Sequence, residues 1–418
     1  MRQSHRLFLL SGSFIITTLV LPAWAQKPDD NFREYIRVQC ETNQEFTSVF
    51  ENFRLCVELF AGSAFGSNPT GRDNIIIIDT PPATTGSTTV KNRFEQIRVG
   101  NQGAGTISAG DGDDFGLFNG GFGFFATDMS GDTERTESEL ENGFASDQNG
   151  SAFGLDYRFS NFILGVTVGS IDNDVVVAGG GSRLQSDGDS EIIYGTWAIT
   201  DNLSLDIYSG SMDTDMDIVR NIEISSINTG TGEPNTISGV ATGSTRSEQD
   251  LEGLSLNYDH YFGAWVVGAF IGLDSVDTET DGYEEEGRRN DDPASVTGLE
   301  LRYPALQTES KTRSLGVRLS YSTEFGWGTL APSLKLTSVR ESEAKGQQID
   351  IRLRASPDTV PPFSVATDDA DSSYMLVNFG ITALMMGGNV QIFLDYEKNS
   401  GDRYLDTTFT TLGVLVGF

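Results

Sequence analysis

Apolar and polar residues alternate one by one along most of the chain after residue 114. Runs of this kind occupy residues 153–159, 164–169, 203–207, 254–259, 315–321 and 392–396. Successive side chains of a β-strand point to opposite faces, so this two-residue period predicts strands with one apolar and one polar face. Because the runs recur to the last residue, the pattern predicts an all-β unit over residues 114–418.

The connections between the predicted strands are of two kinds. Short turns are expected at Ser160-Asn161, Asp201-Asn202, Gly263, Gly326 and Gly387-Gly388-Asn389. Long acidic loops are expected at residues 217–247 and 278–306. Short turns at one end and long loops at the other are typical of outer-membrane barrels. We count twelve strands, an even number as in single-chain bacterial barrels, and predict a twelve-stranded antiparallel transmembrane β-barrel.

Aromatic residues gather at the short-turn ends of the predicted strands. They are Phe159, Phe162, Trp197, Tyr261, Trp265, Phe325 and Trp327. Aromatic side chains are enriched where a membrane protein meets the membrane–water interface. A secreted β-sandwich is the alternative fold, but its apolar face would point inward and it would carry no aromatic band at one end. The band therefore favours the barrel.

The chain ends in a strand pattern, TTLGVLVGF. Leu412, Val414, Val416 and Phe418 fall on one face, and small residues such as Gly413 on the other. In lipid every backbone polar group must be paired, so the last strand is expected to pair with the first. The spacing of Thr411, Gly413, Val416 and Phe418 resembles the C-terminal sorting signal of outer-membrane proteins. This resemblance implies that the barrel assembly machinery recognises Gly413, Val416 and Phe418.

The first 25 residues have the pattern of a secretory signal peptide. Arg2 and Arg6 precede an apolar run over residues 7–21, and Ala23-Trp24-Ala25 forms a cleavage site before Gln26. A membrane anchor would need a stretch of about 20 apolar residues, longer than this run. The mature chain is therefore expected to be exported.

Residues 26–89 read as a short helical segment followed by a linker. Apolar residues recur at helical spacing around Cys40 and Cys56: Phe32, Tyr35, Ile36, Phe46, Val49, Phe50, Phe53, Val57 and Phe60. Two short helices joined by one disulfide would explain this spacing in an oxidising compartment. A redox-active pair is less favoured, because such cysteines prefer C-x-x-C spacing. Ile75–Ile78 is expected to form an extended segment, before a flexible linker.

Residues 90–101, VKNRFEQIRVGN, can form about three helical turns. Arg93 and Arg98 accompany Phe94 and Ile97 in this segment. By itself the pattern is also compatible with an exposed helix between two domains.

The composition excludes some classes of function. The chain has 418 residues and a net charge of −32, from 60 acidic and 28 basic residues. Such a surface repels nucleic acid. The mean hydropathy of −0.23 is that of a soluble protein, but barrels share this value because only alternate residues face lipid.

No catalytic, cofactor or metal site is predicted. A Ser-His-Asp triad would have to use His260, since the other histidine, His5, lies in the signal peptide, and an interfacial histidine explains His260. The acidic run over residues 110–114 hints at calcium, but Phe122 occupies the position of the EF-hand glutamate. A solvated turn is the favoured interpretation.

Residues 114–418 resemble the autotransporter β-domain, the translocator of type V secretion. The resemblance rests on the stretches GGFGFFATDMSGD, SAFGLDYRFSNFILGVTVG, EIIYGTWAITDNLSLDIYSG, DHYFGAWVVGAFIG and TTLGVLVGF. It implies a twelve-stranded barrel in the bacterial outer membrane, with a helix that threads the pore and joins an exported passenger to the barrel. Residues 90–101 stand where that helix would be. Arg93 and Arg98 are then expected to meet lumen carboxylates such as Asp156, Asp206 or Asp259.

The resemblance implies a function, with one departure. Passengers of the family are usually much longer, whereas residues 26–89 are too few for a β-helix of stacked coils. We expect a non-enzymatic translocator in the outer membrane, in contact with lipid and the assembly machinery, that exports or displays this short segment. The alternative is a pore-forming or adhesin-like barrel whose N-terminal segment stays periplasmic; a surface ligand is not predictable from the sequence.

Overall fold

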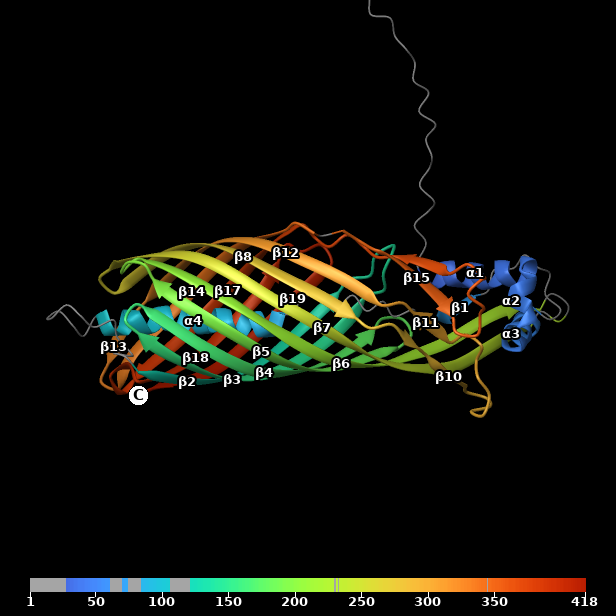
Figure 1. Cartoon of the computed structure of the whole chain (residues 1–418), viewed down its shortest axis with the longest axis horizontal. Helices are drawn as coiled ribbons and strands as arrows, with labels where there is room; N and C mark the ends of the chain where they lie inside the picture. Colours follow the sequence, from blue (N-terminus) through green and yellow to red (C-terminus); the bar gives the residue numbers. More distant parts are fainter. Residues whose placement is uncertain are drawn as a thin grey trace, which may run out of the picture.

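The computed structural model describes residues 28–60, 70–73, 84–105, 121–228, 231, 233–343 and 345–418. Twelve long strands form a closed antiparallel barrel, as predicted (Figure 1). They are β2 (Phe122–Arg135), β3 (Phe144–Phe159), β4 (Phe162–Val177), β5 (Arg183–Ala198), β6 (Leu203–Ile227), β7 (Pro234–Phe262), β8 (Trp265–Thr280), β12 (Leu306–Tyr321), β14 (Gly328–Glu341), β17 (Ser373–Met385), β18 (Val390–Ser400) and β19 (Leu405–Gly417). The last strand closes the sheet on the first, from the pair Leu405–Arg135 to the pair Gly417–Gly123.

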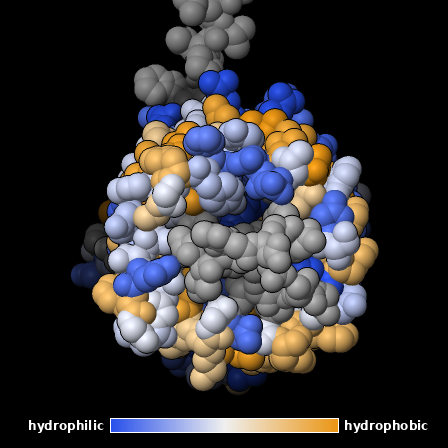
Figure 2. Space-filling view, turned by 90° about the vertical axis from the view of Figure 1, so that its left-hand side faces the viewer, coloured by the Kyte–Doolittle hydropathy of each residue, from blue (hydrophilic) through white to orange (hydrophobic). Residues whose placement is uncertain are grey.

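The barrel wall is apolar outside and polar inside. Leu164 on the outer face of β4 is 55% exposed, whereas Thr167 on the inner face is 4% exposed. Figure 2, which views the end that holds the C-terminus, shows apolar side chains gathered around the perimeter. This arrangement is the reverse of a soluble sandwich and suits a wall surrounded by lipid.

The predicted short turns lie together at one end, which we call the short-turn end. Aromatic rings stack there within and between strands: Tyr157 on Phe159, Phe159 on Phe162, Phe162 on Trp197, and Phe325 on Trp327. Phe325 belongs to a short strand, β13 (Thr323–Phe325), and a 3-10 turn, η1 (Met386–Gly388), connects β17 to β18.

The inner face carries glycines because aromatic rings cover them. Phe125 lies directly opposite Gly154, and a Cβ atom at Gly154 would lie 2.0 Å from a carbon of that ring. In the last strand, a Cβ atom at Gly413 would lie 2.2 Å from the ring of Phe393 on β18. The small residues of the closing strand therefore admit rings from the neighbouring strands.

The predicted long loops are more ordered than the sequence indicated. Residues 217–247 were expected to form a loop, but β6 and β7 continue through them as a paired hairpin up to Ile227 and Pro234. Residues 278–306 were also expected to form a loop, but the end of β8 and the short strands β9 (Tyr283–Glu284), β10 (Glu286–Arg289) and β11 (Leu301–Tyr303) lie within them. The physical reason is that Ile218, Ile222 and Ile224 are buried under other segments, which the acidic residues between them concealed.

Three helices, not two, form the N-terminal segment. They are α1 (Pro28–Thr42), α2 (Gln44–Ser48) and α3 (Phe50–Phe60). The predicted disulfide is confirmed: Cys40 of α1 bonds to Cys56 of α3. Asn43 separates the first two helices and caps α2, because its side chain accepts hydrogen bonds from the N–H groups of Glu45 and Phe46.

The helices pack on the long-loop end of the barrel, opposite the C-terminus (Figure 1). Strand β1 (Thr70–Asp73) pairs with β6, and β15 (Gln348–Leu353) and β16 (Phe363–Ala366) join β9 and β11 in a second sheet. We call this assembly the cap; it comprises residues 28–60, 70–73, 281–305, 345–366 and the projecting ends of β6 and β7. Its apolar core includes Phe32, Ile36, Phe46, Leu55, Leu59, Ile222, Ile224, Ile237, Leu299, Leu301, Ile351 and Phe363.

Helix α4 (Thr84–Gly105) lies inside the barrel (Figure 1). It extends beyond residues 90–101, where the helix was expected, and its 22 residues span about 33 Å. Among the described residues, no helix is both long enough and apolar enough to cross a membrane. Ile75–Ile78, residues 110–114 and the expected signal peptide lie outside the described residues.

Candidate functional site

The candidate site is the lumen and the helix that fills it. One side of α4 is apolar: Val90, Phe94 and Ile97 are buried against the wall. The rings of Phe94 and Tyr194 meet edge-on, with their centroids 5.8 Å apart. These contacts fix the rotation of α4 about its own axis, so its polar side chains face particular strands.

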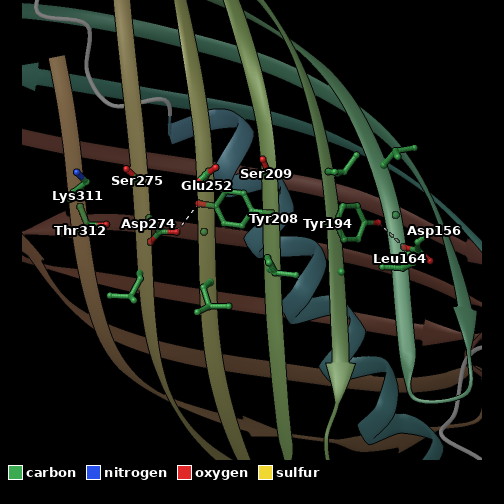
Figure 3. A pocket seen from close by; sticks show the side chains of 18 of the residues that line it. Asp156, Leu164, Tyr194, Tyr208, Ser209, Glu252, Asp274, Ser275, Lys311 and Thr312 are labelled. Atoms are coloured by element: carbon green, nitrogen blue, oxygen red, sulfur yellow. Dashed lines mark hydrogen bonds between the residues drawn. The ribbon is translucent and has the colours of Figure 1, made fainter. Parts of the chain in front are cut away.

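Arg93 forms a buried ion pair with Asp156 of β3. Its Nε donates to Asp156 Oδ2 over 2.7 Å, and its Nη2 lies 2.6 Å from the same oxygen. The hydroxyl of Tyr194 also donates to this carboxylate, over 2.9 Å (Figure 3). Both charged side chains are nearly inaccessible. Because both side chains are buried away from water, either charge would be strongly destabilised without its partner.

Arg98 forms a second ion pair, with Asp206 of β6. Asp206 is held in place by the wall: Thr196 donates to it over 3.0 Å and Asn257 over 2.9 Å. Wall residues that already satisfy Asp206 keep its position independent of α4. The carboxylate of Asp206 is therefore preorganised to pair with Arg98 of α4.

A third contact was not foreseen from the sequence. Arg318 of β12 donates to both oxygens of Asp259 over 2.6–2.9 Å, and its Nη1 donates to Glu95 of α4 over 2.8 Å. Asp259, named as a possible partner of the helix arginines, pairs with a wall arginine instead. The signal in the sequence is the alternation of β12: Val317 and Leu319 face the lipid, so Arg318 between them faces the lumen.

Weaker polar contacts complete the ring around α4. Lys91 lies 3.0 Å from Asp274, and Tyr208 donates to the same carboxylate over 2.6 Å (Figure 3). Thr382 donates to Gln96 over 3.1 Å. The helix is therefore bonded on several sides, and its N-terminal end faces the cap. No group of three or more metal-binding side chains was found within the described ranges. His260 is exposed near the short-turn end, beside Phe262.

Residues 124–397 match the sequence model of a family described as the autotransporter beta-domain. The chain belongs to the autotransporter β-domain family. For this chain, membership implies a translocator β-barrel of the bacterial outer membrane, and domains of this family are generally transport modules.

A solved autotransporter structure shares the fold at low sequence identity. The translocator domain of autotransporter NalP from Neisseria meningitidis is 12% identical, with a TM-score of 0.51 over 80% of this chain and 98% of that one. The beta domain of the Bordetella autotransporter Brka is 14% identical (TM-score 0.46; 72% and 100% covered), and the transport unit of AIDA-I from Escherichia coli 10% (TM-score 0.45; 78% and 97%). A comparison with curated proteins found no match.

The three residues of the predicted assembly signal lie at the seam of this autotransporter barrel. Gly413 lies under the ring of Phe393, whereas Val416 and Phe418 point to the outer face. Phe418 and Phe122 exchange two backbone hydrogen bonds, of 3.0 and 3.1 Å. Recognition by the assembly machinery stays a prediction for these residues.

Proposed function

We propose that this autotransporter displays its own N-terminal segment, residues 28–60, on the cell surface as part of a permanently docked cap, and that it acts without catalysis. One observation carries the proposal: α4 runs through the lumen with its N-terminal end toward the cap, so residues 28–60 lie at the end of the barrel opposite Phe418. Long connections of outer-membrane barrels face outward, which supports a cap outside the cell.

Several contacts support a docked segment and not a released one. Ser226 donates to the carbonyl of Leu59, and Arg289 of β10 pairs with Glu58. Tyr35 donates to the carbonyl of Pro361 over 2.9 Å. Together with the shared apolar core, these bonds tie α1 and α3 to three separate parts of the cap.

A labelling experiment tests the direction. Phe50 is exposed on α3, and Glu324 is exposed on β13 at the short-turn end. We expect Phe50→Cys to react with a membrane-impermeant maleimide on intact cells, and Glu324→Cys to react only after the outer membrane is permeabilised. The periplasmic alternative requires Phe50→Cys to stay unlabelled until permeabilisation, and that result would reject the proposal.

A further inference from the structure

The outer wall above the apolar band is mostly acidic, but one patch on it groups three cations. Outward-facing carboxylates follow strand after strand: Asp172, Asp187, Asp213, Asp215, Glu248, Asp250 and Asp277. On β12 and β14, however, the outward residues include Lys311, Arg313 and Arg340. In a chain of net charge −32, three neighbouring cations on one patch need an explanation.

The two arginines lie directly opposite each other. Arg313 and Arg340 are register partners on β12 and β14, so their Cβ atoms are about 5 Å apart. Like charges in this arrangement repel and weaken the sheet. Within the described part of the chain, neither guanidinium has an ion-pair partner, whereas Lys311 pairs with Glu309. An anion between the two guanidinium groups would remove the repulsion.

Hydroxyl groups surround this basic patch. Ser373 is the register partner of Arg340 on its other side, and Ser275 is the partner of Lys311. Ser342 donates both its hydroxyl and its backbone N–H to the carbonyl of Lys311, each over 2.9 Å, so its hydroxyl is already engaged. Guanidinium, ammonium and hydroxyl donors in one patch match the acceptor oxygens of a phosphate group.

An apolar groove of about 970 Å³ leads away from the patch. It crosses the outer wall from Lys311 and Arg313 over Leu273, Leu254 and Ile207. At its upper edge Lys311, Ser275, Glu252 and Ser209 lie in one row across four neighbouring strands (Figure 3). The groove faces the region that lipid occupies in a membrane.

The height of the patch matches a lipid headgroup. Arg313 is eight residues above Tyr321, whose ring contacts that of Trp265 at the short-turn end. With about 3.3 Å per residue and a tilt of about 40°, this separation is roughly 20 Å along the membrane normal. Arg313 therefore lies near the upper edge of an apolar band that is about 25 Å tall.

We propose that Arg313 and Arg340, with Lys311, bind the phosphate of a phosphorylated, multiply acylated membrane lipid, and that one of its acyl chains lies in the groove over Leu273, Leu254 and Ile207. The site depends on the barrel being in the membrane, not on whether residues 28–60 are displayed. Bound phosphate offsets the repulsion between the arginines and anchors the barrel at a fixed depth.

The test measures binding of diphosphorylated lipid A to the purified full chain in a zwitterionic detergent, by titration of an intrinsic tryptophan signal or by native mass spectrometry. Arg313→Gln/Arg340→Gln is compared with Arg183→Gln/Arg246→Gln, a control that removes two exposed outward arginines elsewhere on the wall. We expect the first pair to weaken binding about tenfold or more and the control to change it less than about twofold. Lipid A without phosphate should bind the wild-type chain as weakly as the first variant binds the phosphorylated lipid.

Three outcomes would overturn the proposal. Equal weakening by both variants would mean that only net charge matters. Unchanged binding by Arg313→Gln/Arg340→Gln would mean that lipid binds elsewhere. Competition by soluble glucosamine phosphate at the same concentration as lipid A would mean an adventitious anion only, with no contribution from the groove. All four arginines are exposed, so heat-modifiable migration on gels should show that every variant still forms a barrel.

Discussion

Two helical segments from the same N-terminal region are held in place by opposite physical means. In the lumen, α4 is surrounded by ion pairs and hydrogen bonds, such as those of Arg93 with Asp156 and Arg98 with Asp206. In the cap, α1 and α3 are held chiefly by an apolar core, to which Phe32 and Leu59 contribute fully buried side chains. One segment is bonded through charge, and the other through the removal of apolar surface from water.

The two kinds of contact have different roles: the lumen contacts fix the position of a helix, and the cap contacts stabilise a docked segment. A buried ion pair has little net stabilising effect, because desolvation offsets the attraction, but it penalises any arrangement that leaves one charge unpaired. The ion pairs in the lumen therefore fix the position of α4 along the barrel axis. Each buried Leu or Phe of the cap contributes about 1.5–3 kcal/mol, so the cap contacts supply the free energy that keeps residues 28–60 docked.

A charge in the cap core should have the largest effect. Ile224 is completely buried, whereas Ile227 at the tip of the same strand is 53% exposed. We expect Ile224→Asp to destabilise the cap by more than about 5 kcal/mol, because an unpaired carboxylate would be buried. Limited proteolysis on intact cells should then cleave residues 28–60, while Ile227→Asp stays resistant. Equal resistance of both variants would show that this core does not hold the segment.

Loss of one lumen charge should have the second largest effect. We expect Arg93→Ala to cost about 3–5 kcal/mol in the placement of α4, since Asp156 would remain buried without its partner. Conductance of the barrel in planar bilayers should rise as the helix leaves the lumen more often. The double variant Arg93→Ala/Asp156→Asn should restore most of the blockage, and Lys91→Ala, at a half-exposed position, should change it little. Conductance that does not respond to Arg93→Ala would show that other contacts hold α4.

Removal of the disulfide should affect the cap alone. Cys40→Ser/Cys56→Ser opens a bridge across a sequence separation of 16, worth about 3 kcal/mol. The cap of this variant should melt at lower denaturant concentration than the wild type, with the conductance unchanged. Reductant should lower wild-type cap stability to the same level and leave the variant unaffected. A change in conductance would mean that cap and lumen are coupled.

The smallest effect concerns a single hydrogen bond. Burial raises the pKa of Tyr35 from 10.0 to about 12, so the folded cap favours the protonated hydroxyl that donates to Pro361. This contribution should be complete below pH 10 and lost between pH 10 and about 12. We expect Tyr35→Phe to cost about 1 kcal/mol at neutral pH and to abolish that part of the alkaline loss. A variant with an unchanged alkaline profile would assign the loss to other groups.

Much of the barrel could be predicted from the sequence, because strand patterning is local. The two-residue period around Leu164 and Leu315 identifies strands, and the position of each short turn fixes where they reverse. The pairing of Arg93 and Arg98 with lumen carboxylates also followed from residue type, given the resemblance to the family. The pairing of Asp259 with Arg318 could not be predicted in this way. Arg318 lies 59 residues away, and only the register of the closed sheet brings the two side chains together.

The sequence by itself determined a wall that is apolar outside and polar inside, a disulfide between Cys40 and Cys56, and a helix with charges suited to the lumen. The tertiary structure alone decided that residues 217–247 continue the barrel and that their isoleucines form a core with α1 and α3. The reason is physical: the period of a strand depends on neighbours two residues apart, whereas the burial of Ile222 and Ile224 depends on helices more than 160 residues earlier in the chain.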